Sequence, residues 1–114
     1  MFGVKLMKIS TKYYDGKLAI ALSGELDHHS ARQAMDGICE AVDASLPRQV
    51  LLDMSKLSFM DSSGIAVILK TDRRLKENGG RLFIDCPQSQ PLKVLEAAGI
   101  GAVVEIISKR EVTT

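Results

Sequence analysis

Three oxygen-bearing side chains stand in a row at one point of this 114-residue sequence, at Asp61, Ser62 and Ser63. They follow an apolar run at residues 50–53 that predicts a buried strand, and they precede apolar residues at helical spacing. Asparagine and glycines at residues 78–80 predict the end of that helix. The three residues therefore lie where a loop becomes a helix. Asp and Ser are typical of this position, because a side-chain oxygen accepts hydrogen bonds from the free N–H groups of the first turn.

Helix capping alone is the simplest interpretation of this segment, but it leaves two features without a reason. A cap needs one oxygen, whereas three are present. The helix that follows is apolar around its whole first turns, at residues 65–69. Ile65, Ile68, Leu69 and Leu75 recur at helical spacing. Val67 lies away from the stripe of Ile65 and Ile68, so we expect it to be exposed beside the serines. An apolar patch next to hydroxyl groups is typical of a surface that docks another protein.

Nucleophilic catalysis is one alternative for these residues. Ser62, together with His28 or His29 and a carboxylate, would supply the parts of a catalytic triad. The sequence has no Gly-x-Ser-x-Gly motif, and the histidines lie in a different predicted loop. A chain this short offers no obvious pocket for a substrate, so we do not expect an enzyme.

A metal site is a second alternative, and its candidate ligands are Asp27, His28, His29, Asp53, Asp61 and Asp85. Neighbouring residues of an extended loop point in opposite directions, which suits chelation by the two histidines poorly. We therefore expect one histidine to pack or cap and the other to be solvated, and we expect neither metal nor cofactor. A nucleotide site is not indicated either, because the Gly-x-x-x-x-Gly-Lys motif is absent.

The composition is ordinary for a globular protein, with 46% hydrophobic and 25% charged residues, and its length predicts one domain over residues 1–114. Fifteen Lys and Arg against 14 Asp and Glu give a net charge of +1, which argues against nucleic acid as a partner. Cys39 and Cys86 lack the spacing of a redox or metal motif, so we expect reduced thiols. The sequence shows neither a signal-peptide core nor an apolar run of ~20 residues, which predicts a cytoplasmic protein with no membrane partner.

Strands alternate with helices along the sequence. We expect strands at residues 4–14, 17–23, 49–53, 81–84 and 103–107. We expect helices at residues 31–44, from 62 to the stop at 78–80, and from 89 to the stop at 99. Asp15 and Gly16 predict a hairpin turn between the first two strands, and Ser30 with Gln33 predicts a capping box.

This alternation predicts an α/β fold with an N-terminal β-hairpin and a small mixed, mostly parallel sheet flanked by helices. The carboxyl ends of parallel strands meet at one edge of a sheet. The loops at residues 24–29, 59–64 and 85–88 should therefore lie close together.

Two segments also carry a family resemblance. Residues 59–65, Phe-Met-Asp-Ser-Ser-Gly-Ile, resemble a signature of the anti-sigma factor antagonists, the bacterial branch of the STAS domains. Residues 24–29, Gly-Glu-Leu-Asp-His-His, resemble a second signature, especially that of the sporulation antagonist of the anti-sigma F factor. The likeness extends from about residue 8 to residue 107. Two separated motifs in the correct order make it specific, and it implies a STAS fold.

The resemblance implies a phosphorylation switch. In this family the serine at the position of Ser62 is phosphorylated by the anti-sigma factor, which is itself a serine kinase. The unmodified protein, a monomer when free, would bind that kinase and release its sigma factor, and a serine phosphatase would restore the phosphorylated form. The expected partner-binding residues are Glu25, Asp27, Asp61, Ser63, Gly64 and Val67.

The sequence departs from the family pattern at Ala66 and Lys70, where glycine and a small residue are usual. Both are expected to face the partner. The sequence therefore leaves a second interpretation open, a STAS interaction module of another regulatory assembly such as a stress-sensing complex or a transporter accessory.

Overall fold

The computed structural model describes residues 6–107, and residues 1–5 and 108–114 lie outside the described part of the chain. Its elements are β1 (Lys8–Tyr14), β2 (Lys17–Leu26), α1 (Ala31–Ser45), β3 (Gln49–Met60), α2 (Ser62–Glu77), β4 (Arg81–Asp85), α3 (Ser89–Ala97), the 3₁₀ helix η1 (Ile100–Ala102) and β5 (Glu105–Ile107). Among the described helices, none is both long and apolar enough to cross a bilayer.

The five strands form one sheet in the order β1-β2-β3-β4-β5. β1 and β2 pair antiparallel, and the remaining neighbours pair parallel, so the predicted mixed α/β sheet is confirmed. Asp15 and Gly16 have φ of 54° and 81°, which confirms the predicted hairpin turn. Cys39 and Cys86, both half-buried, form no disulfide.

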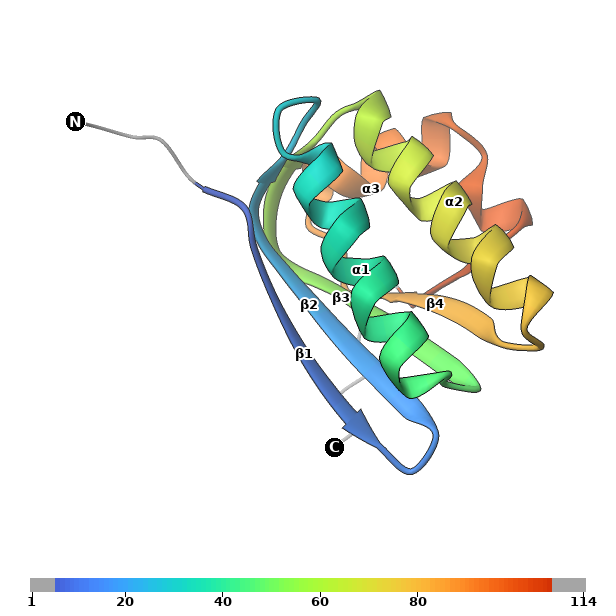
Figure 1. The fold of residues 1–114 in the computed structure, drawn as a ribbon. Helices are drawn as coiled ribbons and strands as arrows, with labels where there is room; N and C mark the ends of the chain where they lie inside the picture. Colours follow the sequence, from blue (N-terminus) through green and yellow to red (C-terminus); the bar gives the residue numbers. More distant parts are fainter. Residues whose placement is uncertain (1–5, 108–114) are drawn as a thin grey trace, which may run out of the picture.

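All three helices lie on one face of the sheet. Each parallel connection moves one strand along the sheet in the same direction, and right-handed crossovers then place every helix on the same side. In Figure 1, α1 and α2 lie in front of the strands with α3 beside α2. This topology leaves the opposite face of the sheet without a covering helix among the described elements.

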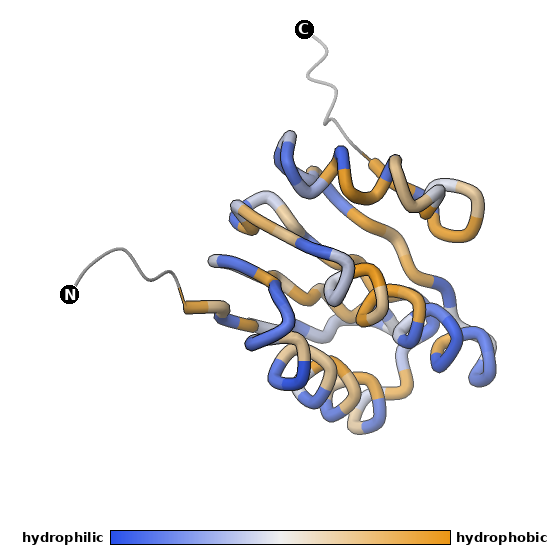
Figure 2. The backbone as a smooth tube through the Cα atoms, turned by 90° about the horizontal axis from the view of Figure 1, so that it is seen from above, coloured by the Kyte–Doolittle hydropathy of each residue, from blue (hydrophilic) through white to orange (hydrophobic). Residues whose placement is uncertain are grey.

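The core fills the space between the sheet and these helices. Side chains alternate between the two faces of a strand, and in β2 Leu18, Ile20 and Leu22 are buried while Ala19 and Ala21 are only half-buried. Apolar residues of the helices complete this layer, among them Ile38 of α1, Ile68 of α2 and Leu95 of α3. Figure 2 shows apolar and polar residues alternating within the turns of the helices, as this one-sided packing requires.

The bounds of the strands differ from their predictions, most of all in β2 and β3. β3 runs to Met60, seven residues beyond the predicted end at Asp53, because the segment after Asp53 continues to pair with a longer β2. The register between the two strands shifts near Ser23 and Gly24, and this irregularity hides the simple alternation in the sequence. β5 begins at Glu105 instead of Val103, because the chain turns after η1. The expected start of β1 at residue 4 is wrong for residues 6 and 7, and residues 4–5 lie outside the described part.

A pair of neighbouring leucines in β3 tests which face of the sheet holds the core. Leu52 points to the helices and is fully buried, whereas Leu51 points to the opposite face and is half-buried. We expect Leu52→Ala to lower the free energy of unfolding by about 2–5 kcal/mol, because it leaves a cavity in the core. Leu51→Ala, the control, should cost less than about 1.5 kcal/mol in the same urea titration. Equal losses would contradict a one-sided core.

Candidate docking site at the start of α2

The passage from β3 to α2 takes a single residue. β3 ends at Met60, Asp61 has an extended backbone, and α2 begins at Ser62. The Oδ1 atom of Asp61 accepts a hydrogen bond of 2.8 Å from the backbone N–H of Ser63, which confirms the predicted helix cap. Because Asp61 alone supplies the cap, the Ser62 hydroxyl is not used for it. Ser62 is exposed and its hydroxyl makes no hydrogen bond within the described residues.

Gly64 allows the first turn of α2 to pack against the ends of β2 and β3. A Cβ at this position would overlap the Cγ of Met60, lie 2.7 Å from its Sδ and lie 3.1 Å from Cδ2 of Leu26. Gly64 is itself buried, so it shapes the site by packing and offers no side chain to a partner.

The side-chain amide of Gln90, in α3, binds the backbone of Met60 at the end of β3. Its Oε1 accepts a hydrogen bond of 2.9 Å from the backbone N–H of Met60, and its Nε2 donates one of 3.0 Å to the Met60 carbonyl. β4 pairs with β3 only as far as Asp53, so the Gln90 amide replaces a neighbouring strand at Met60. Sequence reasoning missed Gln90, because a single glutamine 30 residues away carries no local signal of this contact.

The loop after β2 lies beside this point. The backbone N–H of Asp61 donates to the Leu26 carbonyl at 3.2 Å, which joins the end of β2 to the start of α2. Glu25 is paired with Phe59 across the two strands. The predicted meeting of the loops at residues 24–29 and 59–64 is therefore confirmed. The loop at residues 85–88 does not join them, because β4 ends beside Asp53, seven residues before the end of β3.

Asp27 and Ser30 organise this loop, and the predicted capping box is wrong. The Oγ of Ser30 accepts from the Asp27 N–H at 3.0 Å and donates to the Glu25 carbonyl at 3.0 Å, so it faces the loop instead of the helix. Gln33 donates to the carbonyl of Met7 at 3.3 Å and does not reach back to Ser30. The backbone of Ser30 is already close to helical, with φ of −104° and ψ of −6°, which turns its side chain away from the first free N–H groups.

The carboxylate of Asp27 is held in its charged form. Desolvation acts to raise its pKa, but hydrogen bonds from Ser30 and from the N–H of His29, with the nearby His29 charge, leave that pKa below its usual value. The Oδ1 atom accepts from the His29 N–H at 2.9 Å and from the Ser30 N–H at 3.1 Å. Asp27 therefore has a structural task in the loop, whatever it offers to a partner.

We expected the side chains of His28 and His29 to point in opposite directions, and this prediction is wrong. Their rings lie against each other with centroids 3.9 Å apart, and both residues are exposed. The expectation that one of them packs or caps is also wrong, because the loop turns tightly here and is not extended. Within the described residues, no group of three or more His, Cys, Asp or Glu side chains could hold a metal ion.

Val67 is not exposed, and this part of the prediction is wrong. Only 4% of its surface is accessible, because α1 packs along α2 and covers the side on which Val67 lies. Arg74 of α2 also links the two helices, because its guanidinium donates hydrogen bonds of 3.0 and 2.7 Å to the carboxylate of Asp43 in α1. The exposed apolar residues of α2 are Ala66 and Leu69, and Leu69 is 38% exposed. Assigning one buried stripe to α2 failed because this helix has neighbours on more than one side.

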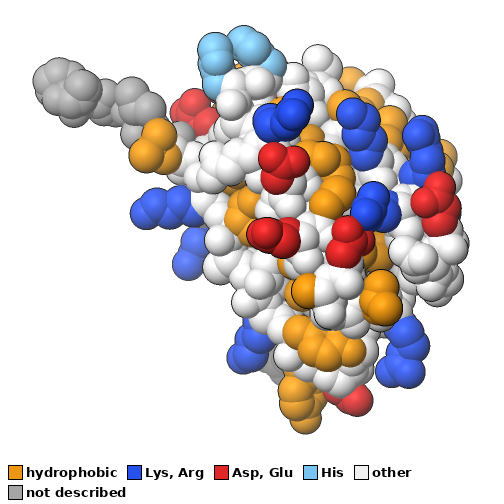
Figure 3. All heavy atoms as spheres, viewed as in Figure 1, with side chains coloured by type: hydrophobic (Ala, Val, Ile, Leu, Met, Phe, Trp, Pro, Cys, Tyr) orange, Lys and Arg blue, Asp and Glu red, His pale blue; other side chains and the backbone are white. Residues whose placement is uncertain are grey.

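Two shallow depressions flank the start of α2. One lies between α2 and α3, has a volume of about 520 Å³ and is lined by Ser62, Ile65, Gln90, Lys93, Val94, Ala97 and Ala98. The other, of about 450 Å³, lies between α1 and α2 and is lined by Ala31, Arg32, Met35, Asp36, Ser63, Ala66, Val67 and Lys70. Figure 3 shows acidic and basic side chains interspersed with apolar ones over this helical face. Such a mixed, open surface can receive another protein and offers no enclosed cavity for a reaction.

Comparison with known proteins places the chain in a family. Residues 8–112 match the STAS domain. The chain belongs to the STAS domain family. The anti-sigma F factor antagonist of Paenibacillus polymyxa is 31% identical to this STAS domain over 101 residues, which cover 88% of this chain and 86% of the relative. The anti-sigma F factor antagonist of Lysinibacillus sphaericus is 34% identical over 84 residues, covering 74% and 72%. The resemblance to anti-sigma factor antagonists is confirmed.

Solved structures agree with the fold. The anti-sigma factor antagonist SpoIIAA in its unphosphorylated form is 28% identical to this STAS domain, with a TM-score of 0.76 and 90% of both chains covered. The phosphorylated form of the Bacillus cell fate determinant SpoIIAA gives a TM-score of 0.68 at 28% identity, covering 90% of this chain and 93% of the other. Anti-sigma factor antagonists are regulatory proteins, so this STAS domain is not an enzyme.

The contact from Gln90 to Met60 can be tested by removing the amide. We expect Gln90→Leu to lower the free energy of unfolding by about 1–3 kcal/mol and to speed hydrogen exchange at Met60, because a backbone pair loses its partner. Gln88→Leu is the matched control, since the Gln88 side chain makes one exposed hydrogen bond of 2.7 Å to the Ser55 carbonyl. It should cost less and leave exchange at Met60 unchanged. Unaltered exchange at Met60 in Gln90→Leu would show that the amide does not hold this residue.

The lowered pKa of Asp27 predicts a dependence on pH. A carboxyl whose pKa is lower in the folded state stabilises the fold above its unfolded pKa of about 3.9, and this contribution disappears as pH falls through the folded pKa. Asp27→Asn should therefore differ most from the wild type near neutral pH. The difference in free energy of unfolding should shrink when urea titrations are repeated at about pH 3. A difference that is the same at both pH values would mean that the charge of Asp27 does not contribute.

Proposed function

We propose that this STAS domain is a phosphorylation-controlled antagonist of an anti-sigma factor. In its unmodified form it binds an anti-sigma factor that is a serine kinase, and it thereby releases the sigma factor. Phosphorylation of Ser62 switches this binding off, and a serine phosphatase restores it. The observation that carries the proposal is the exposed Ser62, whose hydroxyl is left free because Asp61 supplies the helix cap.

The position of Ser62 suits a phosphoryl group that the fold tolerates. The group adds about −1.5 to −2 charges, and the positive end of the α2 dipole stabilises an anion there by about 0.3–1 kcal/mol. Lys93 of α3 lines the same depression as Ser62 and adds a positive charge nearby. Asp61 contributes repulsion, but the site is open to water, which screens it. The phosphorylated relative, with a similar fold, supports a modification of this kind.

The same charge would oppose docking of a partner. Transfer of a doubly charged group into an interface without matching cations costs several kcal/mol. A loss of about 4 kcal/mol is a thousandfold in affinity, so one group is enough to separate the bound and the free states. The switch then needs no movement of the backbone.

The proposed partner surface surrounds Ser62. Glu25, Asp27, Asp61 and Ser63 are half-buried around the start of α2, where each keeps part of its surface accessible. In this proposal the exposed side chains of Ala66 and Leu69 supply the apolar contact that we first expected from Val67. Val67 itself is buried and only lines the depression between α1 and α2. Gly64 contributes by letting α2 approach the sheet.

The setting and partners follow from the same proposal. The two anti-sigma F factor antagonists among the relatives favour a sporulation pathway, in which the protein acts in the cytoplasm. We propose a monomer when free, without nucleic acid or membrane partners.

The alternative is a STAS module of a stress-sensing complex or of a transporter accessory. A pull-down with the anti-sigma kinase encoded in the same genome distinguishes the two, since only the antagonist should retain that kinase.

Two substitutions of Ser62 test the switch. Ser62→Asp should fold normally but bind the kinase at least about tenfold more weakly, because it places a negative charge in the interface. Ser62→Ala should bind like the wild type and resist phosphorylation by the kinase and ATP, as followed by mass mapping of the phosphopeptide. Titration calorimetry measures the binding.

Ser10→Asp is the matched control for the charge, because Ser10 is exposed on β1, away from α2. It should leave binding unchanged. Equal affinity of the wild type and Ser62→Asp would remove the switch from the proposal. A phosphate found on Ser62→Ala would move the acceptor to Ser63.

A further inference from the structure

The face of the sheet that none of the helices within residues 6–107 covers carries an apolar strip. Side chains of four strands contribute to it, namely Tyr14 of β1, Ala19 of β2, Leu51 of β3 and Phe83 of β4, and Ile107 of β5 continues it to the far edge of the sheet. Ala19, Leu51 and Phe83 are half-buried by their neighbours in the sheet, while Tyr14 is 76% and Ile107 36% exposed. Exposed apolar residues in a continuous strip are unusual on a free protein surface and mark a place where something binds.

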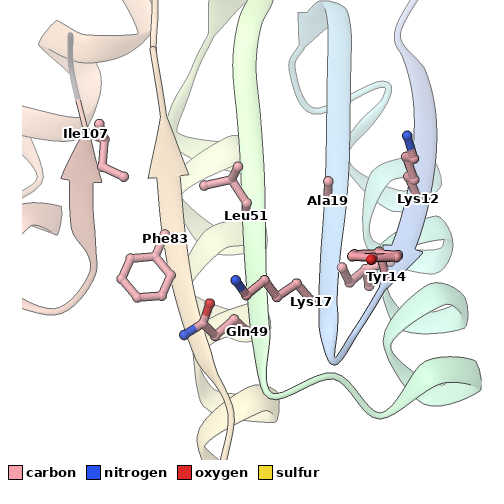
Figure 4. A pocket seen from close by; sticks show the side chains of 9 residues that line it. Lys12, Tyr14, Lys17, Ala19, Gln49, Leu51, Phe83 and Ile107 are labelled. Atoms are coloured by element: carbon pink, nitrogen blue, oxygen red, sulfur yellow. The ribbon is translucent and has the colours of Figure 1, made fainter. Parts of the chain in front are cut away.

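The strip forms a shallow depression of about 440 Å³. In Figure 4, Leu51 and Phe83 lie next to each other, Ile107 lies on the far side of Phe83, and the Lys17 side chain extends from β2 toward β3. The depression runs across the strands. Five strands about 4.8 Å apart span about 19 Å, which is the length of a helix of about 13 residues.

The charged residues lining the depression are all basic. They are Lys12 and Lys17, which are exposed at its border. Arg81 does not line the depression, but it stands over the ring of Phe83, 5.1 Å from the ring centroid. The acidic residues on this face are Asp53, Asp85 and Glu105, and none of them lines the depression. Asp85 is buried, and Glu105 is paired with Phe83 across β4 and β5. Because the charged residues of the lining are both lysines, the depression itself favours an acidic occupant.

We propose that this face docks an acidic amphipathic helix of a partner protein. Its apolar side would lie along Leu51 and Phe83, and its carboxylates would meet Lys12, Lys17 and Arg81. Helices that place an apolar side in a groove and charges at its border are a recurring mode of recognition. The interaction would weaken with salt, because its ion pairs lie at the exposed border.

This surface is separate from Ser62. Leu51 precedes Met60 by nine residues of β3, about 30 Å along the strand, and it points to the opposite face from α2. The two surfaces can therefore be occupied at the same time. The inference does not depend on the proposed function of Ser62.

The test uses a fluorescein-labelled 14-residue peptide of leucine and glutamate with helical spacing, and a second peptide with lysine in place of glutamate. Fluorescence anisotropy with the full chain should show saturable binding of the acidic peptide and at least about tenfold weaker binding of the basic one. Chemical shift changes in ¹⁵N spectra should fall on residues of β2, β3 and β4 around Leu51 and Phe83. Ser62→Asp should bind the acidic peptide as tightly as the wild type does.

Two charge reversals locate the binding. Lys17→Glu should weaken binding of the acidic peptide by about tenfold or more, whereas Arg73→Glu, the same change at an exposed position of α2, should alter it by less than about twofold. The proposal is wrong if the acidic peptide shows no saturable binding, if both peptides bind equally, or if shift changes fall on α1 and α2. Dimerisation through this face in light scattering, or binding to phosphatidylglycerol vesicles that displaces the peptide, would overturn the choice of occupant.

Discussion

The close approach of α2 to the ends of β2 and β3 is the constraint on which the site depends. The chain has one residue in which to change from strand to helix, so the first turn of α2 must lie directly on the side chains of Met60 and Leu26. Only the missing side chain of Gly64 makes this approach compatible with those neighbours. Hydrogen bonds to β2 on one side and to Gln90 on the other fix the backbone of Met60 and Asp61. The side chain of Ser62, the next residue, is therefore exposed to solvent.

This arrangement separates Asp61, which caps α2, from Ser62, the residue for which we propose phosphorylation. Asp61 satisfies the helix end, so a change of charge at Ser62 removes no hydrogen bond on which α2 depends. The free energy of the fold and the free energy of docking are then nearly independent at this point. The proposed switch would benefit from this independence, because the phosphorylated form would have to remain folded in order to be dephosphorylated.

The sequence predicted those parts of the fold that local interactions determine. The hairpin turn follows from the positive φ that Asp15 and Gly16 tolerate, and the cap of α2 follows from an oxygen beside free N–H groups. The errors arise where a distant neighbour decides. Ser30 and Gln33 fit a capping box, but the loop and the β1 side of the sheet take their hydrogen bonds.

The remaining errors have the same origin. Val67 is buried by α1, and the Gln90 contact joins residues 30 positions apart, so no local pattern contains either. That the described helices leave one face of the sheet uncovered was also not anticipated, although the strand order produces it. When every parallel connection advances in one direction and has the same hand, all helices gather on one side. The apolar residues on the other side then need another reason to be apolar, because they contribute little to the core. The docking partner proposed for that face would supply this reason, and it would leave the start of α2 accessible to a second protein.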